Sequence, residues 1–80
     1  MKIKVMIVDD QPILAEGIRS VLSSSDDLEV IGTAEDGRDA LAKMQKALPD
    51  VVLLDIRMPN MNGVVATGEI KKNFPSVKVL

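Results

Sequence analysis

Three aspartates follow apolar runs in this chain, in positions where strands of a sheet would end. Asp9 and Asp10 come directly after the apolar run of residues 3–8, and Asp55 follows the four apolar residues 51–54. In a parallel sheet the carboxyl ends of all strands lie along one edge, where the ligands of doubly wound sheets bind. If the first and third strands are neighbours, we expect the three carboxylates to converge at that edge.

Converging carboxylates favour a particular kind of metal site. They repel one another, and a hard divalent cation relieves that repulsion. Magnesium fits because it takes oxygen ligands, keeps several waters, and is commonly held by one or two carboxylates plus a phosphate. The chain has no histidine and no cysteine, which disfavours softer metals and excludes disulfides and thiol catalysis. A metal-bound carboxylate at a strand end can attack phosphorus and form an acyl phosphate.

The same aspartates also have a plainer interpretation. Paired aspartates after a strand often cap a helix or lie in a solvated turn, and for Asp9 and Asp10 alone capping is favoured by about two to one. Asp55 is harder to explain in this way, because a charge inside an apolar strand run needs compensation. Four further acidic residues are assigned to helix starts and turns, namely Glu35, Asp36, Asp39 and Asp50.

The elements that position these residues follow from the spacing of apolar side chains. Short apolar runs rich in β-branched residues predict strands at residues 3–8, 28–34, 51–56 and 77–80. Helical spacing predicts a first helix from Pro12 to Leu22 and a third helix at residues 64–72. The second predicted helix is marked by Ala40, Leu41, Met44 and Leu48 and is ended by Pro49. The order β-α-β-α-β-α-β implies an α/β fold with a parallel sheet, flavodoxin-like in its strand order.

Composition sets the class of protein. The chain has 80 residues, of which 46% are hydrophobic, so we expect one domain with a packed core. Phe74 is its single aromatic residue, which predicts an aliphatic core. The net charge of −2 offers no basic surface for nucleic acid. The first apolar run stops at Val8, too early for a secretory signal, and no run approaches the ~20 residues of a membrane span. We expect a soluble, cytoplasmic protein.

Three segments together resemble the receiver domain of bacterial two-component response regulators. They are KVMIVDDQP (4–12), EVIGTAEDG (29–37) and VVLLDIRMPNMNG (51–63). The resemblance covers essentially the whole chain, and the start of the first helix is similar to the LuxR-type (NarL/FixJ) subfamily. It implies a CheY-like fold with Asp55 as the phosphoacceptor. It further implies that Asp10 binds Mg²⁺ directly, Asp9 mainly through water, and Arg57 through its backbone carbonyl.

The resemblance also implies partners. A sensor histidine kinase would donate the phosphoryl group, and the domain would promote its own phosphorylation without being a turnover enzyme. DNA would be bound only through an output domain, which these residues do not include. Receivers of the family continue with a Ser or Thr after the fourth strand, a Lys after a fifth strand and an aromatic switch residue. Residues 1–80 are therefore expected to be a receiver domain that is incomplete at its C-terminus, truncated in the fourth strand.

Truncation leads to two further expectations. The fourth strand, and the apolar faces that later helices would cover, are left exposed, so we expect self-association. A non-phosphorylated interaction or dimerisation module of receiver ancestry is the main alternative function. A third possibility, a phosphatase or phosphotransferase of the haloacid-dehalogenase type, would carry Asp-x-Asp after the first strand. Asp9-Asp10-Gln11 does not match that pattern.

Overall fold

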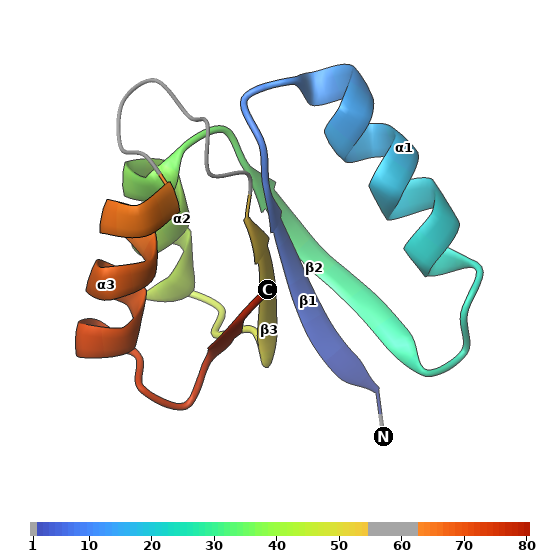
Figure 1. The fold of residues 1–80 in the computed structure, drawn as a ribbon. Helices are drawn as coiled ribbons and strands as arrows, with labels where there is room; N and C mark the ends of the chain where they lie inside the picture. The colour runs from blue at the N-terminus through green and yellow to red at the C-terminus, as the bar shows by residue number, and fades with distance from the viewer. Residues whose placement is uncertain (1, 55–62) are drawn as a thin grey trace.

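The computed structural model describes residues 2–54 and 63–80, which form one parallel four-stranded sheet with helices on both faces (Figure 1). The elements are β1 (Ile3–Val8), α1 (Pro12–Ser23), β2 (Leu28–Ala34), α2 (Gly37–Met44), β3 (Val51–Leu54), α3 (Gly63–Asn73) and β4 (Lys78–Val79). The strand order is β2-β1-β3-β4, and all three strand pairs are parallel. The first and third strands are therefore neighbours, and the flavodoxin-like α/β fold is confirmed.

The second helix departs most from its predicted bounds. It was expected to continue through Leu48, but it ends at Met44, and Leu48 is 44% exposed. After Met44 the chain turns and returns to the sheet, where Asp50 pairs with β1. The Asp50 backbone N–H donates to the Lys4 carbonyl at 2.8 Å, and Asp50 Oδ2 accepts from the Lys4 backbone N–H at 2.8 Å. Helical periodicity carries no information about this long-range pairing.

The other differences in element bounds are smaller. The first helix includes Ser23, which was expected in the following loop. The third helix is one residue longer at each end than the predicted range 64–72, and β4 is shorter than the predicted strand 77–80. The predicted third strand extended through Asp55 and Ile56, and these two residues lie outside the described part of the chain.

Side chains of the sheet alternate between two apolar clusters, one on each face. α1 covers one face, and α2 with α3 cover the other (Figure 1). Val5 and Ile7 belong to the cluster under α1, while Met6 and Val8 belong to the cluster under α2 and α3. The larger cluster consists of Met6, Val8, Ala34, Ala40, Met44, Val52, Ala66, Ile70 and Val77. The aliphatic core is confirmed, and Phe74 only packs against its margin.

A β-bulge adjusts β2 to the shorter β1. Val5 pairs with Val30 and Met6 pairs with Gly32, so Ile31 has no partner in β1. One extra residue reverses the face that the following side chains occupy. Val30 accordingly packs against the cluster under α1, whereas Ala34 belongs to the cluster under α2 and α3.

The first helix has a wider apolar surface than the sheet covers. Ala15 is buried, and Ile18 and Leu22 pack partly buried against the sheet. Three further apolar residues of the helix remain outside this contact: Ile13 is 90% exposed, Leu14 49% and Val21 72%. They line an open groove along α1 together with Gly17. The sequence predicted exposed apolar surface at the fourth strand and on faces that later helices would cover, and in the described residues an exposed apolar surface lies on α1.

Candidate functional site

The carboxyl ends of β1, β2 and β3 meet at one edge of the sheet. Val8 is the last residue of β1, and it lies opposite Ala34 in β2 and Leu54 in β3. Asp9 follows directly and is only 7% exposed. Its backbone N–H donates to the Ala34 carbonyl at 2.9 Å, which continues the β1–β2 ladder by one bond. Asp9 is thus held at the centre of the edge, between the two neighbouring strands of β1.

The two aspartates after β1 have different surroundings. Asp9 Oδ1 accepts from the Gln11 backbone N–H at 2.9 Å, forming a turn that leads into α1. Gln11 is the N-cap residue and makes no side-chain capping bond, while Pro12 begins the helix as predicted. Asp10 is exposed, in a bend between Asp9 and Gln11. Neither aspartate is the N-cap of α1, so the capping interpretation is wrong, whereas the alternative of a turn fits both residues.

Two of the predicted site residues, Asp55 and Arg57, lie outside the part of the chain that the structure describes. Leu54 is the last described residue before them. Within residues 2–54 and 63–80 there is no group of three or more carboxylate, imidazole or thiol side chains that could hold a metal ion. Asp9 and Asp10 are the described members of the expected set. Their oxygens are hard ligands, and in a chain without histidine or cysteine such a donor set fits Mg²⁺.

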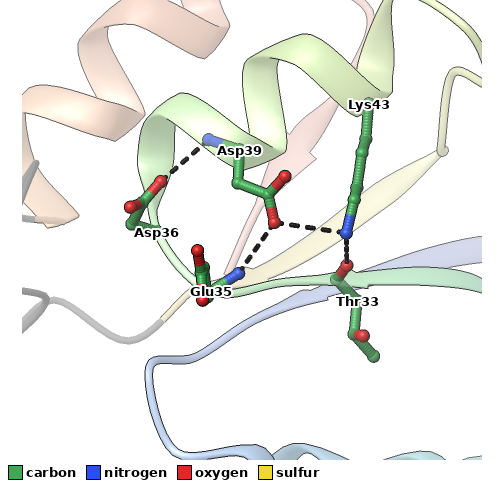
Figure 2. Close-up of polar contacts among 5 residues, drawn as sticks. All are labelled: Thr33, Glu35, Asp36, Asp39 and Lys43. Atoms are coloured by element: carbon green, nitrogen blue, oxygen red, sulfur yellow. Dashed lines mark hydrogen bonds and ion pairs between the residues drawn. The ribbon is translucent and has the colours of Figure 1, made fainter.

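A network of side chains from α2 holds the turn beside this edge (Figure 2). Asp36 is the N-cap of α2, and its Oδ1 accepts from the Asp39 backbone N–H at 2.8 Å. Asp39 Oδ2 accepts in turn from the Glu35 backbone N–H at 3.1 Å, a reciprocal arrangement like a capping box. The predicted placement of Glu35, Asp36 and Asp39 at a turn and helix start is confirmed.

Lys43 completes the network, although it was not among the residues predicted from the sequence. Its Nζ lies 3.2 Å from Asp39 Oδ2 and donates to the Thr33 backbone carbonyl at 2.6 Å. The spacing of four residues between Asp39 and Lys43 on one helix was the signal that could have revealed the ion pair. Nothing in the spacing indicates the bond to Thr33. A hollow of about 240 Å³ at this edge is lined by Asp9, Thr33, Glu35, Asp39 and Lys43, among others.

These features define a doubly wound α/β domain with carboxylates at the carboxyl edge of its sheet. Residues 5–80 match the family model of the response regulator receiver domain, and the chain belongs to that family. It is 46% identical over 80 residues to the response regulator protein VraR of Staphylococcus epidermidis, covering 100% of this chain and 38% of VraR. The chain therefore spans well under half the length of these relatives.

Solved structures agree with that assignment. The receiver domain of the putative response regulator NarL from Mycobacterium tuberculosis is 38% identical, with a TM-score of 0.89 over 98% of this chain and 63% of that chain. The isolated receiver domain of RcsB from Salmonella enterica, in the presence of the phosphomimetic BeF₃⁻, is 30% identical, with a TM-score of 0.90 over 99% of this chain and 59% of that chain. The CheY-like fold and the expected LuxR-type (NarL/FixJ) resemblance are confirmed.

Across the described ranges, no helix combines the length and the apolar character needed to cross a bilayer.

Proposed function

We propose that this receiver domain accepts a phosphoryl group on Asp55 from a phosphohistidine of a sensor histidine kinase. A carboxylate oxygen of Asp55 attacks phosphorus, a P–O bond forms, and the P–N bond to the donor imidazole breaks. The products are an aspartyl phosphate on this chain and a neutral histidine on the kinase, after that ring takes up a proton. The chain has no histidine of its own, so the phosphoryl donor is a separate domain.

The pairing of Val8 with Leu54 carries this proposal. These residues directly precede Asp9 and Asp55 in the sequence. Parallel strands in register direct the residues after their carboxyl ends to the same edge, the usual ligand edge of a doubly wound sheet. Asp9 is at that edge and nearly buried. Family membership supports the same chemistry, because the chain matches receiver domains over residues 5–80.

A magnesium ion is part of the proposal. Asp9 and Asp10 would hold it together with Asp55 and the backbone carbonyl of Arg57. Bound there, Mg²⁺ would neutralise the charge that gathers between carboxylates and phosphate. The contribution of the chain's own residues is to keep Asp9 and Asp10 oriented at the end of β1. The Asp9 hydrogen bonds to Ala34 and Gln11 do this for the first of them.

The proposal extends to partners. The domain would be a cytoplasmic signalling element that promotes its own phosphorylation, not a turnover enzyme. Within a LuxR-type transcription regulator, DNA would be contacted through an output domain beyond residues 1–80, and phosphorylation would control that contact. Residues 1–80 would then be the larger, N-terminal part of a receiver domain, since they span 63% of the NarL receiver structure and 59% of the RcsB one.

Phosphorylation by a small acyl phosphate tests the proposal. The chain is incubated with acetyl phosphate and Mg²⁺, and its intact mass is measured. We expect a gain of one phosphoryl group that is lost in Asp55→Asn and when Mg²⁺ is chelated. Asp50→Asn is the control, since Asp50 lies at the opposite edge, where it bonds Lys4. No adduct, under conditions that phosphorylate the NarL receiver, would overturn the proposal.

A second candidate function is supported by the exposed surface of α1. A receiver-like module that never takes phosphate could dimerise through Ile13, Leu14 and Val21, which are 90%, 49% and 72% exposed. Magnesium titration separates the two functions. Binding that vanishes in Asp10→Ala favours the phosphoacceptor, whereas no binding in the unaltered chain favours the interaction module.

A further inference from the structure

We propose that Lys43 and Asp39 are positioning residues for Asp9, acting through the turn between β2 and α2. Their side chains bond the Thr33 carbonyl and the Glu35 N–H, on the two sides of Ala34, and we call this pair of contacts the clamp. The Ala34 carbonyl in turn accepts from the Asp9 backbone N–H. This rests on the proposed function, because it assigns to Lys43 and Asp39 a role in the magnesium site to which Asp9 would belong.

The first half of the clamp acts on Thr33. Among the strands that the structure describes, β2 lies at the edge of the sheet, with β1 as its neighbour. The Ala34 carbonyl points toward β1, where it accepts from Asp9. Carbonyls alternate in direction along a strand, so that of Thr33 points to the open edge, where none of the described strands pairs with it. Lys43 Nζ donates to this carbonyl at 2.6 Å and so supplies the hydrogen bond that a neighbouring strand would otherwise give (Figure 2).

The second half of the clamp acts on Glu35. The Glu35 backbone N–H donates to Asp39 Oδ2 at 3.1 Å, and the same oxygen lies 3.2 Å from Lys43 Nζ. Asp39 is itself fixed at the start of α2, since its backbone N–H donates to Asp36 Oδ1 at 2.8 Å. The residues before and after Ala34 are therefore both tied to one ion pair on α2, as Figure 2 shows.

The clamp reaches Asp9 through one hydrogen bond. The Asp9 N–H donates to the Ala34 carbonyl at 2.9 Å, and these residues are only 7% and 4% exposed. A shift of the turn by a few tenths of an ångström would lengthen this bond and move the Asp9 carboxylate. Metal ligands are sensitive to such shifts, because their supporting partners set ligand orientation.

The sign of the effect distinguishes positioning from simple electrostatics. Lys43 is a cation that lines the same hollow as Asp9. If it acted only by its charge, Lys43→Met would remove a repulsion and strengthen Mg²⁺ binding. Positioning predicts the opposite, a weaker site. Asp39→Asn is less informative alone, because charge and positioning both predict weaker binding. It is used in the double variant with Lys43→Met, which leaves the charge of the pair unchanged at zero.

The experiment is a titration of the ¹⁵N-labelled chain with Mg²⁺, followed by NMR. We expect Lys43→Met to weaken binding roughly tenfold, the lower end for supporting partners of metal ligands. The double variant should be weakened to a similar extent, and Lys43→Arg should restore most of the affinity because it keeps a cationic donor. Amide hydrogen exchange at Asp9 and Glu35 should accelerate in Lys43→Met without added metal, which is a readout independent of binding.

Two control variants isolate the effect. Lys46→Met makes the same change of charge at an exposed lysine three residues further along and should leave affinity unchanged or slightly higher. Asp50→Ala removes the Lys4 hydrogen bond at the other edge of the sheet. It should lower stability, seen in thermal unfolding, with no change in Mg²⁺ affinity.

The outcomes separate the two proposals. If the unaltered chain binds Mg²⁺ and Lys43→Met binds it equally or more tightly, Asp39 and Lys43 do not position Asp9. The same conclusion follows if Asp50→Ala weakens binding as much as Lys43→Met does, because the effect would then be general loss of stability. If the unaltered chain binds no Mg²⁺, the proposed function is contradicted, and this inference, which rests on it, is contradicted as well.

Discussion

Val8 and Leu54 lie opposite one another on neighbouring parallel strands. Each is the residue directly before an aspartate, Asp9 and Asp55. The β-bulge at Ile31 brings Ala34 level with Val8 on the other side of β1. Three strand ends are thereby aligned along one edge, and the register of the sheet is the feature that makes a carboxylate site feasible there.

The two aspartates after β1 should respond differently to removal. Asp9→Ala is expected to lower the free energy of unfolding by about 1–2 kcal/mol, because the Gln11 N–H loses the Asp9 oxygen as its acceptor and Asp9 is nearly buried. Asp10→Ala should stay within about 0.5 kcal/mol, since Asp10 is exposed. Both variants should lose Mg²⁺ affinity. Urea unfolding and metal titration test this, and an Asp10→Ala variant that binds Mg²⁺ normally would remove Asp10 from the site.

The Asp36 side chain should contribute to stability as the N-cap of α2. Asp36 is 7% exposed, and its Oδ1 accepts from the Asp39 N–H at 2.8 Å. Asp36→Ala is expected to destabilise the fold by about 0.5–2 kcal/mol, the range for lost caps. Asp36→Asn keeps an acceptor oxygen and should cost much less. Thermal unfolding of both variants checks this, and equal losses would contradict the role assigned to this hydrogen bond.

The cluster under α2 and α3 should be sensitive to the loss of one methyl group. Ile70 is fully buried, at 0% exposure. Ile70→Val is expected to cost about 0.5–1.5 kcal/mol, from lost burial and the small cavity left behind. Ile13→Val, the same substitution at a site 90% exposed on α1, is the matched control and should change stability far less. Denaturant midpoints give both values, and comparable losses would contradict the assignment of Ile70 to the core.

The uncovered surface of α1 should drive self-association. Ile13 and Val21 are 90% and 72% exposed apolar residues on the same helix. Replacing both by serine is expected to shift the chain toward monomer, as measured by light scattering over a range of concentrations. Arg19→Ser, on the polar side of α1, serves as control and should leave the distribution unchanged. A chain that is already monomeric at high concentration would contradict the prediction.

Several features could be read from the sequence because they depend on neighbours along the chain. The strands Ile3–Val8 and Leu28–Ala34 were predicted with their observed bounds, since short apolar, β-branched runs have few other stable conformations. Pro12 at the start of α1 and Asp36 before α2 follow from local preferences for fixed φ and for capping. The same local patterns carried the family resemblance, and with it the expected roles of Asp9, Asp10 and Asp55.

Tertiary structure decided the features that depend on residues far apart in sequence. α2 ends at Met44 and the chain returns to pair Asp50 with Lys4, whereas helical periodicity extends equally well to Leu48. Helical spacing placed an apolar arc on α1 but could not show that the sheet covers only the part around Ala15. The bond from Lys43 to Thr33 joins the end of a helix to an edge strand. Such contacts arise from strand register and packing, which bring together groups that no local pattern connects.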